Sequence, residues 1–282
     1  MANEEMRATW TDSGTGWVEQ EAVFDATFAP ITDALLAAAD LAPAHRVLDV
    51  GCGSGTLLAA AVASGAETVG VDLSSTMVEA ARRRVPDATV LLADAQTTDP
   101  LAAAPGRPFD RVVSRFGVMF FDDPVAAFRR LHEAAAPGAR LAFACWRSYA
   151  ENPTMSLGQD VLVERLGEEP APVAADAPGP MAFADPDRTR AVLSGAGWTD
   201  VVVEPLDVTL DYAYDGSDGV DNRLATVLAT TTGRRARARL EPELGPAGWA
   251  SLLDDVRRHV AAARVDGALR LPAATWIVTA TA

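Results

Sequence analysis

Short hydrophobic runs rich in β-branched residues alternate with alanine-rich amphipathic segments between residues 46 and 146. The hydrophobic runs predict buried strands at 46–50, 67–73, 88–94, 109–116 and 140–146. The segments between them predict helices at 56–65, 74–85 and 122–138. This alternation is typical of a parallel sheet with helices on both faces. Ligands of such sheets bind at the carboxyl ends of the strands, near the switch in strand order.

The second half of the chain is less regular. It predicts a helix at 185–198, a strand at 199–205, mainly helical structure over 211–266 and a final strand at 275–282. A stretch rich in proline, alanine and glycine predicts a loop at 168–180. Near the N-terminus, hydrophobic side chains recur at helical spacing over 17–28, which indicates a helix that either packs on the sheet or forms a lid.

The charged residues exclude several classes of function. The 282-residue chain has 39 acidic and 24 basic side chains, a formal net charge of −15, and every basic one is arginine. Binding to nucleic acid or anionic lipid depends on Lys and Arg that neutralise phosphates, so neither is an expected partner. Without lysine, the chain has no P-loop, no Schiff-base lysine and no kinase-type catalytic lysine.

Cysteine and histidine give no sign of a metal site or a disulfide framework. Cys52 and Cys145 form no C-x-x-C pair, and the three histidines occur in unrelated contexts without an H-E-x-x-H motif. The first residues lack the pattern of a signal peptide, and no apolar stretch reaches the length of a membrane span, about 18 residues. We therefore expect a cytoplasmic protein without a metal or a membrane partner.

A glycine-rich turn follows the first predicted strand in the sequence VLDVGCGSG, residues 47–55. Gly51, Gly53 and Gly55 carry no side chain, so the backbone can turn sharply and approach a ligand closely. The dinucleotide fingerprint G-x-G-x-x-G fails because Thr56 stands at its last position. Many α/β folds contain such a turn, so the turn alone does not identify the ligand.

Three aspartates lie at successive predicted strands. Asp49 lies in the first strand, Asp72 ends the second and Asp94 ends the third, at intervals of 23 and 22 residues. Neighbouring strand ends lie about 4.8 Å apart, so the three carboxylates can line one nucleoside. There Asp72 can accept hydrogen bonds from both hydroxyls of a ribose, and Asp94 from an adenine amino group. Taken singly, each aspartate is equally consistent with a turn or a helix cap.

These segments resemble the successive motifs of class I S-adenosylmethionine-dependent methyltransferases. The similar sequences are VLDVGCGSG, VGVDLS, LLADAQ and FDRVVSRFGVMFF. Farther along, AVLSGAGWTDVVVEP and WIVTATA are similar to the last helix and the sixth and seventh strands of that fold. The resemblance implies a doubly wound, Rossmann-like α/β fold, whose seven-stranded sheet is mostly parallel with an antiparallel last strand, plus helical lid insertions. The opening from Trp10 to Trp17 resembles a bacterial small-molecule subgroup.

The resemblance also divides the chain into a core and additions. The expected parts are an N-terminal helical lid (1–44), a cofactor-binding core (45–147), an insertion or lid (148–184), a core helix and strand (185–210), a helical lid insertion (211–270) and the final core strand (271–282).

Roles for individual residues follow from the same resemblance. It implies that S-adenosylmethionine, which yields S-adenosylhomocysteine as product, contacts Asp49, Gly51, Cys52, Gly53, Asp72, Leu73, Met77, Asp94, Ala95, Gln96, Ser114 and Trp17. In that set, Asp49 and the glycines surround the methionine part and Asp72 the ribose. Asp94 and its neighbours surround the adenine, and Ser114 approaches the cofactor's amino group through its carbonyl.

Residues after the fourth and fifth predicted strands face the same sheet edge and are candidates for contacts with the methyl acceptor. They are Arg115, Phe116, Met119, Trp146 and Tyr149. Further candidates for a pocket roofed by the insertions are Phe24, Phe28, Tyr212 and Tyr214, whereas Phe120 and Phe121 are expected in the core. Aromatic lining favours an apolar, aromatic or polyketide-like small molecule as acceptor.

Methyl transfer requires little acid–base chemistry, because the sulfonium already activates the methyl group. A base is needed only where the acceptor must lose a proton. We interpret His45 and His132 as surface or packing residues and His259 as a solvated helix residue or part of a lid. A carboxylate base from the lid segments stays open, and we assign no catalytic base. The arginine-rich run 234–239 is interpreted as a solvated helix face.

Methyl transfer to a small molecule is therefore the predicted function, and other functions on the same fold stay open. One is a cyclase or rearrangement enzyme that binds the cofactor without using its methyl group. Another is a non-catalytic cofactor-binding protein. A nicotinamide enzyme is disfavoured by the missing fingerprint. The acceptor atom (O, N or C) and the oligomeric state are not specified by any motif.

Overall fold

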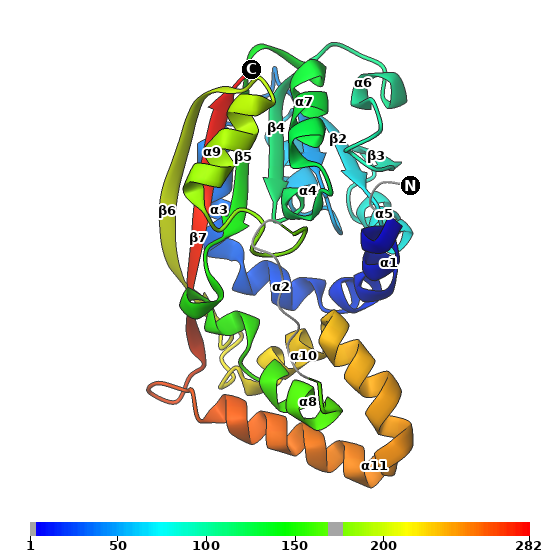
Figure 1. Cartoon of the computed structure of the whole chain (residues 1–282), viewed down its shortest axis with the longest axis vertical. Helices are drawn as coiled ribbons and strands as arrows, with labels where there is room; N and C mark the ends of the chain where they lie inside the picture. Colours follow the sequence, from blue (N-terminus) through cyan, green and yellow to red (C-terminus); the bar gives the residue numbers. More distant parts are fainter. Residues whose placement is uncertain (1–3, 169–176) are drawn as a thin grey trace.

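The computed structural model describes residues 4–168 and 177–282, and these residues form one seven-stranded sheet (Figure 1). The strands are β1 (Arg46–Val50), β2 (Glu67–Asp72), β3 (Thr89–Leu92), β4 (Phe109–Arg115), β5 (Ala135–Trp146), β6 (Thr199–Asp211) and β7 (Arg270–Thr281). Their order is β3-β2-β1-β4-β5-β7-β6, and every adjacent pair is parallel except the two that contain β7. The predicted fold class is confirmed.

Helices cover both faces of the sheet. They are α1 (Glu4–Glu19), α2 (Glu21–Thr27), α3 (Ala29–Ala39), α4 (Thr56–Ala63), α5 (Ser75–Arg84), α6 (Pro100–Ala103), α7 (Pro124–Ala134), α8 (Gln159–Leu166), α9 (Pro186–Gly195), α10 (Val220–Ala229) and α11 (Thr231–Ala261). Figure 1 shows α7 and α9 in front of the sheet and α3 behind it. All five residues of β1 are buried as a result, which explains the strand's nearly unbroken hydrophobic run.

The chain changes direction across the sheet after β3. It steps outward from β1 to β2 and β3, and then returns to place β4 on the other side of β1. The carboxyl ends of β1 and β4 therefore flank the switch in strand order, where open α/β sheets bind ligands.

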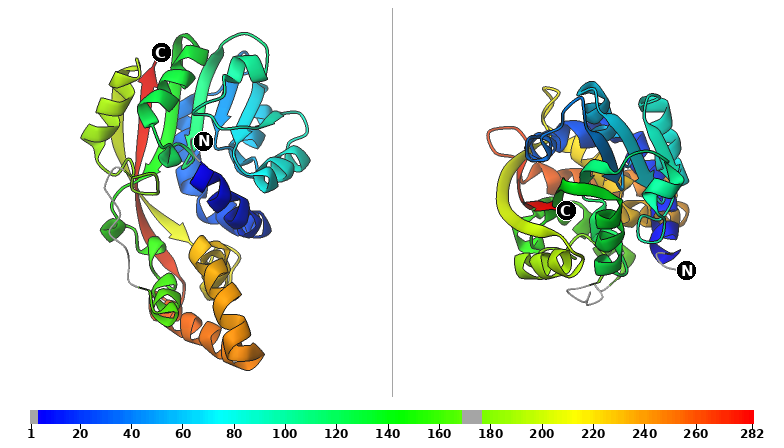
Figure 2. Two further views of the ribbon diagram at one scale, coloured as in Figure 1. Left: turned by 45° about the vertical axis from the view of Figure 1, so that its right-hand side comes forward. Right: turned by 90° about the horizontal axis from the view of Figure 1, so that it is seen from above.

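A second lobe lies beyond the carboxyl ends of the parallel strands (Figure 2). This lower lobe consists of α8, α10 and α11, with the short 3₁₀ turns Tyr149–Glu151 and Pro153–Met155. Strands β6 and β7 reach into it from the sheet. Helix α11 is kinked at Gly245 (φ 69°), which precedes Pro246. The lobe thus places helical residues from 220–261 opposite the sheet edge.

The sequence misplaces the ends of several elements. The helix expected at 122–138 ends at Ala134, and β5 begins at Ala135. Pro137 explains this, because proline lacks the N–H that a helix needs and favours extended backbone in the residue before it. The strand expected at 199–205 continues to Asp211, and its partner begins at Arg270 instead of residue 275. Pro205 is tolerated because β6 is the edge strand.

Two predicted segments extend outside the described residues. Residues 169–176 of the expected loop at 168–180, and residues 1–3 of the expected N-terminal lid, are not described. Among the described helices, no single one is long and apolar enough to cross a membrane. Helices α2 and α3 meet the criteria of length and composition only as a pair, and they are bent by 68°.

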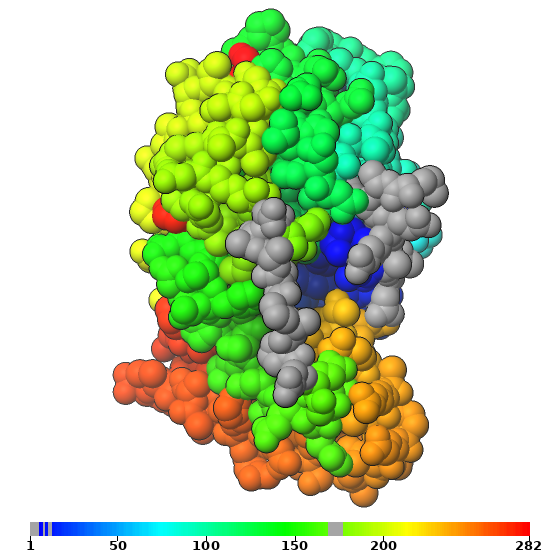
Figure 3. Space-filling model, in the orientation of Figure 1, coloured from blue at the N-terminus to red at the C-terminus, as the bar shows by residue number. Residues whose placement is uncertain are grey.

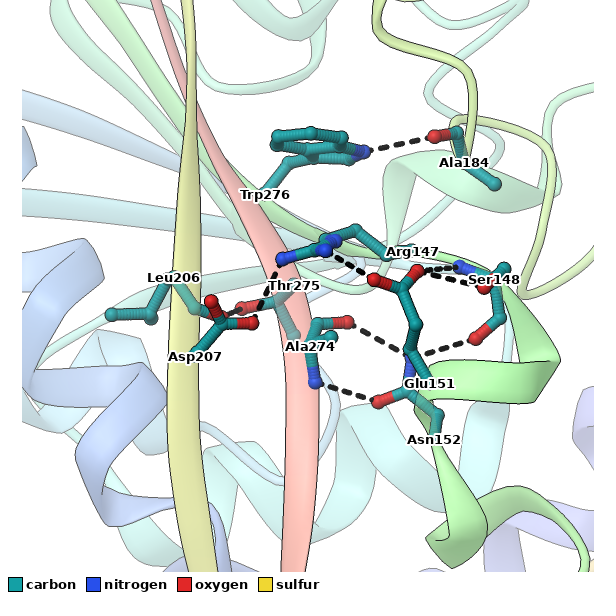
Figure 4. Close-up of polar contacts among 10 residues, drawn as sticks. All are labelled: Arg147, Ser148, Glu151, Asn152, Ala184, Leu206, Asp207, Ala274, Thr275 and Trp276. Atoms are coloured by element: carbon teal, nitrogen blue, oxygen red, sulfur yellow. Dashed lines mark hydrogen bonds and ion pairs between the residues drawn. The ribbon is translucent and has the colours of Figure 1, made fainter.

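The passage from β5 into the lower lobe is fixed by polar contacts (Figure 4). The buried Asn152 accepts a hydrogen bond from the Ala274 N–H and donates one to the Ala274 carbonyl, both at 2.9 Å. Arg147 forms ion pairs with Glu151 and with Asp207. These contacts hold the first turns of the lobe against β6 and β7.

Candidate functional site

A cavity of about 520 Å³ lies between the sheet edge and the lower lobe. On the face seen in Figure 3, the surface is hollowed between the N-terminal helices, in blue, and the start of α11, in orange. Of the residues expected to hold the cofactor, those that line this cavity are Trp17, Asp49, Gly51, Cys52, Gly53, Asp72, Leu73, Met77, Asp94 and Ala95. All five residues expected near the acceptor also line it: Arg115, Phe116, Met119, Trp146 and Tyr149.

The glycine turn between β1 and α4 requires glycine for two different reasons. Gly51 has φ 68°, and a Cβ atom there would lie 2.7 Å from the Gly117 Cα. Gly53 has φ 54°, and no atom lies within 4 Å of the place of its missing Cβ. Gly51 thus lets the β1 and β4 ends approach each other, whereas Gly53 leaves an open surface on the cavity.

Asp49 is a buried carboxyl group at the floor of the cavity. Its side chain is 1% exposed, and neither oxygen has a hydrogen-bond partner among the described residues. Burial raises the pKa of Asp49 to about 8, with Arg115 opposing the shift and Asp72 adding to it. Buried polar groups in folded proteins are nearly always paired, so this one is suited to a polar or cationic ligand group.

Asp72 ends β2 and contacts the glycine turn directly. One oxygen accepts a hydrogen bond from the Gly53 N–H (2.9 Å), and the other accepts one from the Ser74 N–H (2.8 Å). Burial raises the pKa of Asp72, although these backbone hydrogen bonds oppose the shift. Each oxygen keeps capacity for a second donor, as the two hydroxyls of a ribose require.

Two of the expected cofactor residues do not line the cavity. Gln96 accepts a hydrogen bond from the Asp123 N–H (3.0 Å) and so connects two loops. The Ser114 hydroxyl donates to the Val50 carbonyl (2.6 Å) and accepts from the Gly117 N–H (3.1 Å), which holds the β1 and β4 ends together. The contacts of Gln96 with the adenine, and of Ser114 with the amino group through its backbone carbonyl, stay predictions.

Aromatic rings form one wall of the cavity. Phe116 and Trp146 stack with their centroids 4.5 Å apart and their planes 1° apart. Phe28 meets both rings edge-on, at 5.7 and 5.9 Å. Phe116 adopts φ 68°, a conformation that side chains other than glycine rarely take, so the fold holds this ring in place at a local cost.

Arg115 is held beside this wall by neighbouring side chains. Its guanidinium donates to the Thr32 hydroxyl (2.7 Å) and lies 3.5 Å from an Asp25 oxygen. Burial lowers the pKa of Arg115, and Asp25 opposes the shift. Asp25 also pairs with Arg84 at 2.6 Å. Arg115 therefore has a carboxylate partner within the protein, which it shares with Arg84.

The sequence predicted that the insertions would roof the pocket and named Tyr212, which lines the cavity, but it did not single out the polar residues of the lower lobe. Polar residues of that lobe line the cavity together with Tyr212: Thr154, Gln159, Arg223, Thr226, Thr230, Thr231 and Thr232. Phe24 and Phe28 line it as expected, but Tyr214 does not. Phe120 and Phe121, expected in the core, line it as well. No motif in this part of the sequence marks which helix face meets the cavity.

The histidines lie away from the cavity. His132 packs edge-on against Trp198 with centroids 5.3 Å apart, His259 contacts Asp160 at 3.0 Å, and His45 accepts a hydrogen bond from the Ala42 N–H. Within the described ranges, no group of His, Cys, Asp and Glu side chains is arranged to hold a metal ion.

Comparison with known proteins matches residues 48–143 to a methyltransferase domain family. A trans-aconitate 2-methyltransferase from Variovorax paradoxus is 32% identical over 179 residues, which cover 63% of this chain and 62% of the relative. The chain spans about half the length of the first curated relatives it matches.

Solved structures share the fold at low identity. A Bacillus halodurans protein superposes with a TM-score of 0.53 at 14% identity, covering 88% of this chain and 97% of that one. The [4+2]-cyclase SpnF superposes with a TM-score of 0.52 at 20% identity, covering 89% and 80%. The matched segment contains the glycine turn and the ends of β1 and β2 that line the cavity, so residues 48–143 are similar to a methyltransferase domain, and the whole chain shares the fold of these solved structures.

Proposed function

We propose that this protein transfers a methyl group from S-adenosylmethionine to a small-molecule acceptor. The observation that carries the proposal is Asp49, whose two buried oxygens face the cavity without a partner among the described residues. The open surface at Gly53 and the remaining acceptor capacity of Asp72 fit the same ligand. The site suits a molecule with a cationic end, a ribose and an adenine.

Each part of the cofactor then has its own residues. Asp49 with the glycine turn would hold the methionine part, Asp72 the ribose, and Asp94 with Ala95 the adenine. When bound, S-adenosylmethionine supplies a methyl group on a positively charged sulfur, and its transfer leaves a neutral thioether. The bond from carbon to sulfur breaks as the bond from carbon to the acceptor atom forms.

The protein's own contribution is to orient the acceptor and to exclude water. The stacked pair of Phe116 and Trp146 would provide an aromatic contact for the acceptor at the β4 and β5 ends. Correct alignment alone can supply much of the acceleration of a bimolecular step. No histidine in the described residues lines the cavity, and we assign no general base.

We also propose the functional division of the chain into the core and the lids at 1–44, 148–184 and 211–270. It is supported by cavity-lining residues in all three additions, for example Trp17, Thr154 and Thr226. These segments would close the site over the acceptor and so determine which molecules enter.

A second function is consistent with the likeness to SpnF, a [4+2]-cyclase that shares the fold. A cyclase would bind the cofactor and leave its methyl group in place. Methyl-labelled cofactor separates the two functions, because label reaches the product only in methyl transfer.

A thermal-shift titration with S-adenosylmethionine, S-adenosylhomocysteine and NAD tests the cofactor assignment. A ligand at a hundred times its Kd adds about 2.7 kcal/mol, which corresponds to several degrees at this chain length. We expect shifts with both adenosyl compounds and none with NAD. Protein free of copurified ligand that responds to neither adenosyl compound would contradict the proposal.

A further inference from the structure

A buried arginine lies where the lower lobe closes the cavity. Arg223 on α10 is 3% exposed and lines the cavity. Its guanidinium donates to the carbonyls of Thr154 (2.8 Å) and Leu157 (2.7 Å) and to the hydroxyls of Tyr212 (3.2 Å) and Thr226 (3.3 Å). The cavity-lining members, Thr154, Tyr212, Arg223 and Thr226, are called here the Arg223 cluster.

The guanidinium of Arg223 has no ion-pair partner among the described residues. Every hydrogen-bond acceptor of Arg223 is a neutral oxygen, and no carboxylate in the described residues forms an ion pair with it. Arg115, at the other side of the cavity, does have one in Asp25. A buried charge is costly unless an opposite charge accompanies it, so the Arg223 cluster is suited to an anion that enters the cavity.

A count of hydroxyl protons leads to the same ligand. The Tyr212 and Thr154 hydroxyls lie 2.8 Å apart and share one hydrogen bond. Whichever of them donates, the proton of the other has no acceptor among the described residues. Both side chains are buried, at 1% and 7% exposed. One hydroxyl donor beside an arginine is thus left for an oxygen atom of a ligand.

The aromatic wall indicates which kind of ligand bears that oxygen atom. Phe116 and Trp146 stack face to face in parallel planes, 1° apart in angle, and both line the same cavity as the Arg223 cluster. A stacked aromatic pair of this kind favours planar rings as neighbours, because planar rings stack on aromatic side chains. A ligand that satisfies both features is planar and aromatic and has an anionic oxygen group.

We propose that the methyl acceptor is an aromatic carboxylic acid, whose carboxylate binds the Arg223 cluster while its ring lies against Phe116 and Trp146. This inference rests on the proposed function for the identity of the ligand as acceptor. The carboxylate orients the ring, and it neutralises the charge of Arg223, which has no ion-pair partner among the described residues.

The test is calorimetric titration of two probes that differ in charge but hardly in shape, 2-naphthoate and 2-naphthamide. Both are titrated into protein with and without S-adenosylhomocysteine. We expect 2-naphthoate to bind at least about tenfold more tightly, a modest value for a charge-assisted hydrogen bond. Equal affinities, or no binding of either probe at about millimolar concentration, would overturn the proposal.

Variants show whether the preference comes from the Arg223 cluster. Arg223→Gln should abolish the preference for the carboxylate, whereas Arg223→Lys, which keeps the charge, should retain part of it. Arg257→Gln is the matched control, because Arg257 is an exposed arginine in the same lobe. If Arg223→Gln does not fold, the double variant Tyr212→Phe/Thr154→Val removes the spare hydroxyl donor and should weaken the preference. An unchanged preference in the folded Arg223 variant, or in this double variant, would overturn the proposal.

The design keeps two failures apart. If S-adenosylhomocysteine binds but the probes show no preference, the acceptor class is wrong and the proposed function stands. If S-adenosylhomocysteine does not bind, the proposed function fails. The probe titration without it still reports on the anion site.

Discussion

Asp49 shows how one residue can link stability to ligand binding. Its carboxyl group is buried with no partner among the described residues, and its pKa is raised to about 8, chiefly by burial. Between its ordinary pKa of 3.8 and this value, the folded protein holds a proton that the unfolded chain has released. Stability from this group therefore falls as pH rises from about 4 to 8. Such a cost is tolerated where a ligand relieves it.

Asp49→Asn should stabilise the ligand-free protein at pH 8 and weaken binding of S-adenosylhomocysteine. Asparagine carries no charge, so the gain in the free energy of unfolding should shrink as pH falls towards 4. Each pKa unit corresponds to about 1.4 kcal/mol, so a gain of a few kcal/mol is expected at pH 8. Thermal unfolding over pH 5–8 measures it, with the exposed Asp33→Asn as control. A variant less stable than the wild type at pH 8 would refute the account of Asp49.

The sequence singled out residues whose type and spacing are characteristic of a ligand site, and it missed residues whose place at the cavity depends only on how the chain folds. Asp49, Asp72, Gly51 and Gly53 line the cavity, and the sequence singled them out because their types and spacing suit a close approach to a ligand. The side chains of Gln96 and Ser114 form local hydrogen bonds, and the predicted contact of the Ser114 carbonyl with the cofactor does not depend on them. Arg223 carried no signal, since a single arginine in a helix does not show which face is buried.

Among the elements, the passage from β5 into the lower lobe depends on one amide side chain. Asn152 satisfies both backbone groups of Ala274 and also donates to the Ser148 carbonyl. It thereby positions Tyr149 and Thr154, which line the cavity on either side of it. The sequence around Asn152 predicted only an insertion and not this contact, because the partner of Asn152 lies 122 residues away.

Asn152→Ala should lower the free energy of unfolding by about 1–3 kcal/mol, because the Ala274 N–H loses its acceptor, whereas the Ala274 carbonyl keeps the hydrogen bond from the Arg147 N–H. Affinity for the acceptor should fall more than affinity for S-adenosylhomocysteine, since Thr154 belongs to the acceptor side. Denaturant unfolding and calorimetry measure the two effects. Ser156→Ala, an exposed change in the same segment, is the control. Stability equal to that of this control would show that the contact is unimportant.

The two lobes are connected by α1, which packs closely on both. A Cβ atom on Gly14 would lie 2.7 Å from the Ser74 hydroxyl in the core, and one on Gly16 would lie 2.6 Å from the Ala229 carbonyl in the lower lobe. Trp17 and other residues of the same helix line the cavity. The parallel sheet could be predicted from the alternation of strands and helices, but the packing of α1 against both lobes could not. A helical pattern such as that of 211–266 indicates that some helix faces are buried, but it does not indicate which other element covers them.

Gly16→Val should separate α1 from α10 and loosen the cavity. Its side chain would overlap with backbone atoms of Ala229, so a loss of about 1–3 kcal/mol in stability is expected. Affinities for cofactor and acceptor should both fall, because α1 lines the cavity between the lobes. Glu19→Ala, exposed on the same helix, is the control. Unchanged binding of both ligands would mean that α1 does not help to close the site.

The most direct test of the cofactor site is calorimetric titration of S-adenosylhomocysteine into wild-type protein and Asp72→Asn. We predict one site per chain in the wild type and a loss of about 1.5–3 kcal/mol of binding free energy in the variant, the range for hydrogen bonds to charged groups. Glu79→Gln, the same change at an exposed position of α5, should bind as the wild type does. No binding by the wild type, or an unchanged Kd in Asp72→Asn, would contradict the site described here.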